Sequence, residues 1–292
     1  MKWDGVRILA LWEAGRVQLI NRKGARRTKQ YPELAGLGPV FPAGTLIDGE
    51  LVVLAEGKPQ FDLILRRDQR SQAAAIQQGV EQWPITYAGF DLLYWQGKDI
   101  RSWPLVRRQS ALAAIWPDNC PQLHLVESFP QGEELFAAVG KLGWEGIVAK
   151  HGQSVYTPGK TRSDWRKIKH WRHITCAVGG YTLRAGLPSG LLLGIYDDAE
   201  FRYVGRAGSG LSNDDWQALL GYLQAAETDT SPFTTVVPQA RDRELRWVEP
   251  HLAVQIKFME WSADLKLRTP VIQGFLPATR ADCSLHQKGG QA

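Results

Sequence analysis

The chain contains little cysteine and no long apolar segment. Only three of its 292 residues are cysteines, Cys120, Cys176 and Cys283, and they lie far apart. This spacing excludes a disulfide scaffold and a paired zinc-ligand motif, and it is typical of a reducing compartment. No apolar run approaches the roughly 18 residues that a membrane-spanning helix needs. The longest candidate, LLLGIY at 191–196, has the length of a strand.

The first residues also lack the pattern of a secretory signal. Asp4 and Arg7 interrupt the start MKWDGVRILALW, and the apolar stretch that follows them is short. Together with the cysteine content, this predicts a cytoplasmic protein that does not contact a membrane.

The excess of positive charge is small and uneven. Lysine and arginine number 35 against 30 acidic residues, a net charge of +5 that many proteins without a nucleic-acid partner share. Five of the basic residues fall in RKGARRTK at 22–29. Such a run is either a solvated loop or a surface that contacts phosphate groups, and composition alone leaves both open.

The sequence pattern of the first part of the chain is typical of antiparallel sheets. A hydrophobic content of 44% and a length of 292 residues allow about two domains of roughly 150 residues. Strand-like runs are expected at 6–12, 16–22, 45–54, 85–95 and 145–150, and helices at 109–116 and 132–143. Leu135, Phe136, Val139 and Leu142 share one face of the second helix. Strands outnumber helices and hairpins recur, which predicts an α+β fold with antiparallel sheets.

The pattern of strand-like and helix-like segments changes after Trp171. Five strand-like runs separated by glycine-rich turns surround one helix at 212–226, for which Ser212 is the expected N-cap. That pattern in about 120 residues predicts an OB-fold β-barrel. We therefore expect two domains, residues 1–170 and residues 171–292.

The segment K-W-D-G-V-R at 2–7 places a lysine beside groups that suit a nucleotide. A lysine is nucleophilic only when neutral, and roughly one in a few thousand is neutral at pH 7 unless nearby cations or burial lower its pKa. Gly5 allows a close approach of a ligand, and Arg7 can bind phosphate or carboxylate. Taken alone, a surface lysine beside a turn explains the segment equally well.

Two further segments place charged side chains on one face of a strand. In I-D-G-E-L at 47–51, Asp48 and Glu50 alternate with apolar neighbours. In D-W-R-K-I-K at 164–169, Trp165, Lys167 and Lys169 share a side. Two ammonium groups so close repel unless an anion lies between them. The alternative for the lysines is an exposed edge strand, where lysine opposes aggregation.

These segments belong to a set of six that occurs in a known order. The others are N-R-K-G at 21–24, Y-A-G-F-D-L-L-Y at 87–94 and E-G-I-V-A-K at 145–150. In this order they resemble the motifs of the covalent nucleotidyltransferases, which are DNA ligases, RNA ligases and mRNA capping enzymes. The set is most similar to the ligase domain of bacterial non-homologous end-joining DNA ligases, the LigD type.

The resemblance implies an antiparallel-sheet adenylyltransferase domain (ATP-grasp-like) that precedes an OB-fold DNA-binding domain. It also implies a role for each matched residue. Lys2 would be the nucleophile that carries AMP, and Asp4 and Arg7 would orient it or the nucleotide. The nucleotide itself would be bound by Glu50 at the ribose, by Phe90 stacked on adenine, by Arg22, Lys167 and Lys169 at the phosphates, and by Arg268 in L-R-T-P at 267–270. Glu145 and Glu50 would bind metal. For Glu145 the alternative is an exposed strand-end carboxylate, and for Phe90 a core position.

The reaction that the resemblance implies is ATP-dependent sealing of nicked or broken duplex DNA with Mg²⁺ or Mn²⁺, by a monomer that works with a DNA-end-binding protein. Two alternatives stay open, an RNA ligase or capping-type nucleotidyltransferase and a catalytically impaired DNA-end-binding module.

The two ends of the sequence depart from the family pattern. Near the C-terminus Arg280 and Asp282 stand as a shifted pair, and Cys283 replaces an expected lysine. At the start, the family has a strand and a loop before the nucleophile. We therefore expect Lys2 to be mobile and hydrated, and a form with an upstream extension to react faster with ATP.

Overall fold

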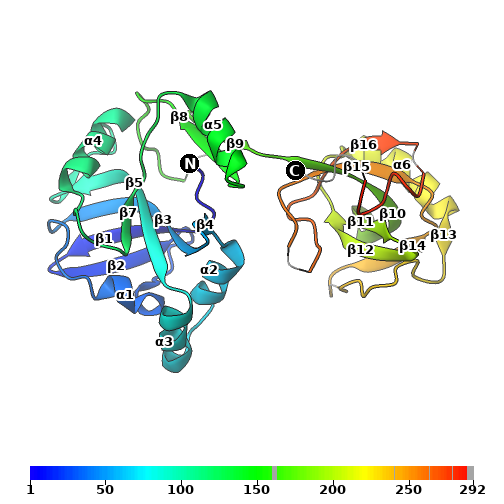
Figure 1. Cartoon of the computed structure of the whole chain (residues 1–292), viewed down its shortest axis with the longest axis horizontal. Coiled ribbons are helices and arrows are strands. Elements are labelled where there is room, and N and C mark those ends of the chain that lie inside the picture. The colour runs from blue at the N-terminus through cyan, green and yellow to red at the C-terminus, as the bar shows by residue number, and fades with distance from the viewer. Residues whose placement is uncertain (160–162, 240, 263, 278, 288–292) are drawn as a thin grey trace. The chain divides into compact units, whose positions relative to one another are not determined.

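A computed structural model describes residues 1–159, 163–239, 241–262, 264–277 and 279–287. The chain forms two compact units, Met1–Lys169 and His170–Ala292, and each has its own sheets and helices (Figure 1). Both units combine mostly antiparallel sheets with fewer helices, so the predicted α+β class is confirmed.

A seven-stranded sheet forms the body of the first unit. Its main path runs β2-β1-β3-β5-β6, while β4 pairs with β3 and β7 pairs with β5 in the sheet's one parallel pairing among the described residues. The bounds are β1 Val6–Glu13, β2 Arg16–Asn21, β3 Thr45–Ala55, β4 Lys58–Pro59, β5 Ile85–Trp95, β6 Lys98–Asp99 and β7 Leu123–Leu125. Ala14 and Gly15 join β1 to β2 with positive φ angles, as a tight hairpin turn requires.

The alternation predicted for β3 is present. Ile47 and Leu51 are fully buried in the core. The Tyr87 ring packs over Gly49, where a Cβ atom would lie 2.5 Å from it. The Tyr87 hydroxyl donates to the Ile47 carbonyl at 2.9 Å. Asp48 and Glu50 are consequently left on the opposite face of the strand.

Helices lie around the sheets of this unit (Figure 1). They are η1 Thr28–Gln30, α1 Pro32–Ala35, α2 Phe61–Asp68, α3 Ala73–Gln82, α4 Leu105–Ile115 and α5 Gly132–Lys141. The sequence predicted α4 and α5, and α4 ends just before Pro117 as expected. It missed α1 to α3, because their apolar faces are narrow: α3 buries only Ile76 and Gly79. Of the four residues expected to share a face of α5, Val139 is buried, whereas Leu142 is the C-cap residue and is 57% exposed.

A separate two-stranded sheet lies beside α5 and contains the last two motifs of the unit. β8 Gly146–Lys150 runs antiparallel to β9 Trp165–Lys169, with Val148 opposite Lys167 and Lys150 opposite Trp165. Opposed residues of an antiparallel pair project to the same side of the sheet. Lys150, Trp165 and Lys167 therefore share one face.

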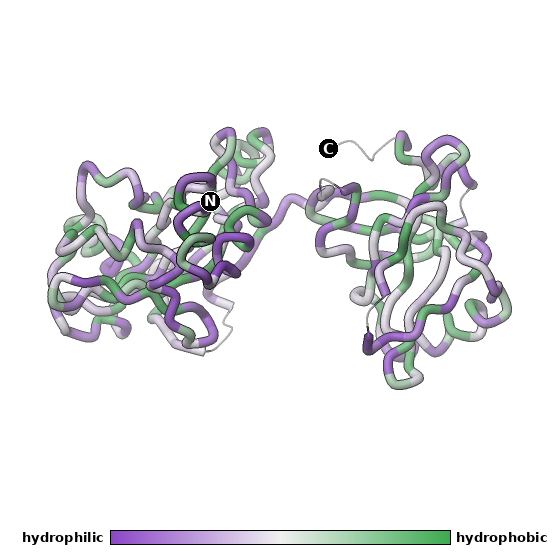
Figure 2. The backbone as a smooth tube through the Cα atoms, turned by 90° about the horizontal axis from the view of Figure 1, so that it is seen from below, coloured by the Kyte–Doolittle hydropathy of each residue, from purple (hydrophilic) through white to green (hydrophobic). Residues whose placement is uncertain are grey.

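The second unit is a curled sheet with one helix against it. The path is β12-β11-β10-β14-β13, and β15 joins β10 to β16. The bounds are β10 Arg172–Arg184, β11 Leu187–Asp197, β12 Glu200–Ala207, α6 Asn213–Ala225, β13 Glu227–Thr228, β14 Glu244–Val248, β15 Ala253–Phe258 and β16 Val271–Leu276. Ser212 caps α6, and its side chain exchanges hydrogen bonds with Asp215 as a capping box. In Figure 2 hydrophobic residues follow the inner strands of this unit.

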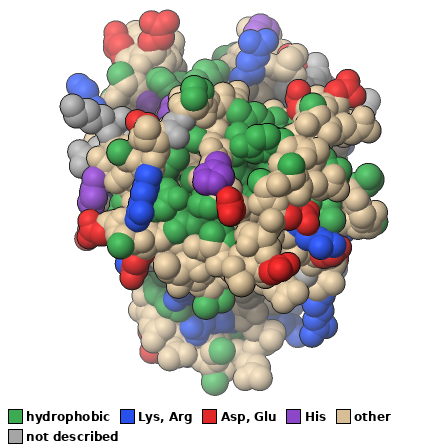
Figure 3. All heavy atoms as spheres, turned by 90° about the vertical axis from the view of Figure 1, so that its right-hand side faces the viewer, with side chains coloured by type: hydrophobic (Ala, Val, Ile, Leu, Met, Phe, Trp, Pro, Cys, Tyr) green, Lys and Arg blue, Asp and Glu red, His purple; other side chains and the backbone are tan. Residues whose placement is uncertain are grey.

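An aromatic cluster covers one face of this sheet. Phe233 stacks on Phe201 with ring centroids 4.9 Å apart, and its ring lies over Gly179, where a Cβ atom would be 2.5 Å away. The amide of Thr234 donates to the Phe201 carbonyl at 2.8 Å, which ties the loop to β12. On the face of the second unit that Figure 3 shows, hydrophobic side chains gather among charged ones.

We predict that Phe233→Ala lowers the free energy of unfolding of the second unit by about 3 kcal/mol, because a buried aromatic ring is lost and a cavity remains. Hydrogen exchange of the β11 and β12 amides, read by mass spectrometry, measures this in one unit alone. Val236→Ala is the control, since Val236 is 87% exposed and its loss is expected to cost less than about 0.5 kcal/mol. Equal effects of the two substitutions would contradict the packing role of Phe233.

Candidate active site

A cavity of about 950 Å³ lies in the first unit. This volume is within the range of about 300–1,000 Å³ that is usual for small-molecule sites. The cavity brings together six of the predicted site residues from five separate motifs: Lys2, Arg7, Arg22, Glu50, Phe90 and Lys167.

Lys2 is fixed at the cavity by two contacts. Its backbone amide donates to the Gly146 carbonyl at 2.8 Å, and its ammonium group forms an ion pair with Glu145. The side chain of Lys2 is only 12% exposed. The expectation that Lys2 is hydrated was therefore wrong, because its side chain is paired and mostly buried. The expectation that an upstream extension speeds the reaction with ATP stays a prediction.

Glu145 stands between two ammonium groups. Its second carboxylate oxygen, Oε1, lies 2.8 Å from Lys169 Nζ. Burial raises the pKa of Glu145, but the hydrogen bonds from Lys169 and Lys2 outweigh it, and the net pKa is lowered. The carboxylate is thus ionised at neutral pH. It is half-buried and paired, unlike the water-exposed strand-end carboxylate that was the alternative.

Aromatic side chains pack next to both members of the Lys2–Glu145 pair. Trp3 follows Lys2 and Trp144 precedes Glu145, and their rings meet edge to face at 5.1 Å. His124 of β7 lies against Trp3 at 4.9 Å, and burial lowers the pKa of His124. No sequence signal pointed to this contact, because the three residues come from distant segments.

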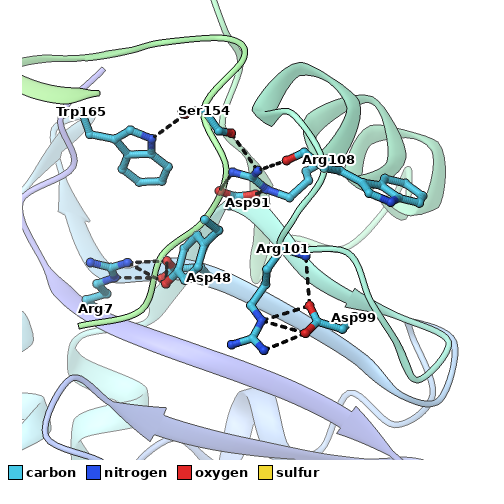
Figure 4. Close-up of polar contacts among 10 residues, drawn as sticks. Arg7, Asp48, Asp91, Asp99, Arg101, Arg108, Ser154 and Trp165 are labelled. Carbon is cyan, nitrogen blue, oxygen red and sulfur yellow. Dashed lines mark hydrogen bonds and ion pairs between the residues drawn. The ribbon is translucent and has the colours of Figure 1, made fainter. Parts of the chain in front are cut away.

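Arg7 lies opposite Glu50 in the β1–β3 pairing. Its guanidinium group binds the buried Asp48 carboxylate with two hydrogen bonds, one of them 2.9 Å from Nε to Oδ1. Figure 4 shows this pair beside a second one formed by Asp91 and Arg108. Asp48 was predicted to face this side of β3 but not to be a partner of Arg7.

Glu50 lines the cavity and is largely removed from water. Burial raises its pKa to about 7; Lys2 and Arg7 lower it, while Asp48 and Asp4 add to the rise. Asp4 thus acts on the site through its charge, although it does not line the cavity. The orienting role predicted for Asp4 stays a prediction.

Phe90 lines the cavity and is not a plain core residue. Lys150 holds its ammonium group 4.4 Å from the centre of the Phe90 ring and 4.1 Å from that of Trp165. Burial lowers the pKa of Lys150 to about 8, with Asp91 and Asp48 opposing the shift. Sequence reasoning missed Lys150, although its place at the end of E-G-I-V-A-K and the alternation of β8 could have indicated it.

The remaining basic residues divide into two groups. Arg22 and Lys167 are exposed side chains that line the cavity, whereas Lys169 pairs with Glu145. Within the run 22–29, Arg27 is bound to Asp68 at 3.0 Å. The run 22–29 thus contains both an arginine that is paired within the protein, Arg27, and an exposed cation at the cavity, Arg22.

The C-terminal residues singled out in the sequence belong to the second unit. Arg268 forms an ion pair with Glu260. Arg280 donates to the Asp198 carbonyl at 3.0 Å, and Asp282 accepts from the Thr279 amide at 2.7 Å. Cys283 is buried against the sheet. The nucleotide-binding role of Arg268 stays a prediction.

Comparison with known proteins identifies the family. The model of the ATP dependent DNA ligase domain matches residues 1–169, and the model of the ATP dependent DNA ligase C terminal region matches residues 184–278. The chain belongs to the ATP-dependent DNA ligase family. The predicted resemblance to the LigD type is confirmed by relatives of that name at 30–32% identity.

Three relatives illustrate the match. The multifunctional non-homologous end joining DNA repair protein LigD of Mycobacterium tuberculosis is 32% identical over 94% of this chain and 35% of its own length. DNA ligase C2 of Mycolicibacterium smegmatis is 31% identical over 84% and 71%. A solved structure of mycobacterial DNA ligase D complexed with ATP and MES has a TM-score of 0.52 and 31% identity, covering 95% of this chain and 88% of that one.

This ligase chain spans about a third of the length of the LigD relatives that it matches. The structural match confirms the predicted fold, a nucleotidyltransferase domain of antiparallel sheets followed by an OB-fold barrel. One of these relatives is named as a DNA ligase and another as a non-homologous end joining DNA repair protein. Among the described residues, no helix is both long and apolar enough to cross a membrane.

The raised pKa of Glu50 predicts a stability that depends on pH. Its folded pKa of about 7 lies above the ordinary value of 4.5, so the folded state loses stability as the pH rises from about 4.5 to about 7. Glu50→Gln removes this penalty and is expected to stabilise the protein by on the order of 2 kcal/mol at pH 8 and hardly at all at pH 4.5.

Urea denaturation of the variant and the parent at the two pH values measures the difference. Glu13→Gln, which removes an exposed carboxylate of β1, is the matched control. A gain of stability that is the same at both pH values would show that burial does not perturb Glu50.

Proposed function

We propose that this chain seals breaks in duplex DNA through an AMP that is carried on Lys2. The observation that carries the proposal is the fixed Lys2 ammonium group, which pairs with Glu145 at the wall of a nucleotide-sized cavity. A nucleophile held in one place gains the rate advantage of an intramolecular reaction. Membership of the ATP-dependent DNA ligase family gives the chemistry.

The proposed reaction consists of three phosphoryl transfers. The neutral Lys2 amine attacks the α-phosphorus of ATP, a P–N bond forms, and pyrophosphate leaves. The 5′-phosphate of the DNA break then attacks the lysyl-AMP, which gives adenylylated DNA and frees Lys2. Finally the 3′-hydroxyl attacks the activated 5′-phosphate, the phosphodiester forms, and AMP leaves. Covalent catalysis divides one difficult step into easier ones.

The cavity residues divide between the base, the sugar and the phosphates. Phe90 is proposed to stack on adenine, and Glu50 with Arg7 to bind the ribose. Lys167 is an exposed cation of the cavity wall and is proposed to contact the α-phosphate. Arg22 is proposed to bind phosphate at the cavity mouth. Preorganised cations of this kind stabilise the charge of a phosphoryl-transfer transition state.

The carboxylates of the site suit Mg²⁺ or Mn²⁺ that is held mostly by phosphate and water. Among the described residues there is no cluster of three or more His, Cys, Asp or Glu side chains that could hold a metal. Mg²⁺ commonly uses only one or two carboxylates beside substrate phosphates. Glu145 and Glu50 both lie near Lys2 and would supply them. The ion would neutralise charge on the phosphates.

The cellular setting is part of the proposal. The LigD relatives are named as non-homologous end joining proteins. We infer that this chain acts in the cytoplasm as a monomer on broken or nicked duplex DNA, together with a DNA-end-binding protein. Sealing assays on nicked DNA and nicked RNA, with ATP and GTP in parallel, test the choice of substrate and nucleotide.

Lys2→Ala is predicted to abolish AMP labelling of the protein and still to allow sealing of DNA that already carries AMP on its 5′-phosphate, because only the first two transfers need the amine. Labelled ATP with a divalent metal, followed by a denaturing gel, measures the first activity. A pre-adenylylated nicked duplex measures the second. Normal labelling of the variant would exclude Lys2 as the nucleophile.

Lys167→Ala is predicted to slow self-adenylylation at least ~10-fold, since a lost hydrogen bond to a charged group costs about 1.5–3 kcal/mol. The matched control is Arg166→Ala, the neighbouring exposed cation of β9 that does not line the cavity. Rates of AMP labelling at equal ATP compare the two. Similar effects at both positions would support the edge-strand explanation of Lys167.

A further inference from the structure

Residues 151–157, which follow β8, are fastened to the body of the first unit. The Gly152 carbonyl accepts from the Val106 amide of α4 at 3.0 Å. The Ser154 carbonyl accepts from Arg108 Nη1 at 3.0 Å. The Tyr156 amide donates to the Arg101 carbonyl at 2.8 Å. The connector 151–157 is therefore held at three points.

The arginine that binds the Ser154 carbonyl, Arg108, belongs to a buried ion pair. Arg108 binds Asp91 of β5 with two hydrogen bonds of 2.7 and 2.8 Å, and both side chains are fully buried. The Trp165 indole donates to Ser154 Oγ at 3.3 Å. Figure 4 shows Arg108 between Asp91 and Ser154, with Trp165 on the far side of Ser154. A buried, bidentate pair of this type has a defined geometry.

This support fixes the ring of Tyr156. The guanidinium carbon of Arg108 lies 6.0 Å from the ring centre, and the Trp165 ring meets it edge to face at 6.3 Å. The Tyr156 hydroxyl donates to Asp48 Oδ2 at 2.9 Å and accepts from Arg7 Nη2 at 3.1 Å. Tyr156 thus closes a three-membered network with Arg7 and Asp48, although it does not itself line the cavity.

The network leaves the Nη1 nitrogen of the Arg7 guanidinium group for a ligand. Nε and Nη2 are occupied by Asp48 and Tyr156. Within the described part of the chain, no group accepts a hydrogen bond from Nη1, and the Arg7 side chain is 42% exposed at the cavity. Because a guanidinium group is planar and rigid, fixing two of its nitrogens also fixes the direction of the third.

We propose that Tyr156 is a positioning residue for nucleotide binding, which orients the Nη1 nitrogen of Arg7 into the cavity. The proposal rests on the proposed function, in which the cavity takes ATP. It extends that function to a residue outside the six motifs, and it makes the connector 151–157 a support of the binding site. Burial and the Asp48 carboxylate raise the pKa of Tyr156, so the hydroxyl keeps its proton near neutral pH.

Tyr156→Phe removes the hydroxyl and keeps the ring. We expect it to raise the KM for ATP, measured as the half-saturating ATP concentration of single-turnover self-adenylylation, roughly 3- to 10-fold, as for the loss of one hydrogen bond. The limiting rate of labelling should change less than about 2-fold. Tyr94→Phe is the matched control, since the Tyr94 hydroxyl also binds an aspartate, Asp99, but on a hairpin outside the cavity. It should leave both constants unchanged.

A double substitution tests whether Tyr156 acts through Arg7. Arg7→Lys keeps a positive charge beside the buried Asp48 but removes the fork. Adding Tyr156→Phe to Arg7→Lys should then raise the KM less than about 2-fold further. An unchanged KM in Tyr156→Phe, or an equal increase with and without the Arg7 fork, overturns the proposal.

Calorimetric titration of ATP into Lys2→Ala proteins separates this proposal from the reaction itself. These proteins lack the proposed nucleophile, so the titration reports binding alone. If the parent chain binds ATP but never becomes labelled, the proposed reaction fails, and a weaker Kd with Tyr156→Phe still supports the positioning role. If the parent is labelled, and Lys2→Ala binds ATP with the same Kd with and without Tyr156→Phe, only the positioning role fails. If no ATP binds, both fail.

Discussion

The ion pair between the Lys2 ammonium group and the Glu145 carboxylate connects the first residues of the chain to the two-stranded sheet of β8 and β9. Glu145 is shared with Lys169, so one carboxylate balances two cations on neighbouring segments. In a partly buried site such charges are costly unless each has a partner. The arrangement therefore requires β8, β9 and the first residues to be in place together, and the cavity exists only when they are.

Two buried carboxylates near the cavity depend on a similar balance. Asp48 and Asp91 are fully buried, and each is paired with one arginine. These pairs fix Arg7 at the cavity wall and the connector 151–157 behind it. Glu50 lines the cavity, and burial raises its pKa to about 7. The site thus combines carboxylates that are paired with cations and one carboxyl group that titrates near neutral pH.

The proposed ligase reaction would account for this distribution of charge. Its substrates would bring phosphate groups to a cavity where Arg22 and Lys167 are exposed cations. Phosphoryl transfer needs charge neutralisation and positioning more than covalent participation, apart from the lysine itself. Lys150 adds a cation between two aromatic rings at the same wall, where its pKa is lowered to about 8.

The sequence by itself determined the fold class, the family and the main residues of the cavity. Alternation along β3 and β9 predicted the strand faces of Glu50 and Lys167, which line the cavity, because a strand has a fixed period of two. Short apolar patterns in α1 to α3 were too weak to predict helices, since packing against the sheet decides their stability. The order of six motifs identified the family because each motif is local.

Only the tertiary structure decided which groups meet. Lys2 was expected to be hydrated, yet its partners Glu145 and Gly146 lie more than 140 residues away in the sequence and contact it. Tyr156 and the Trp3–Trp144 contact carry no local signal for the same reason. A contact between distant segments depends on how sheets pack and pair. Local residue patterns define the strands, but the pairing of those strands places the side chains around the cavity.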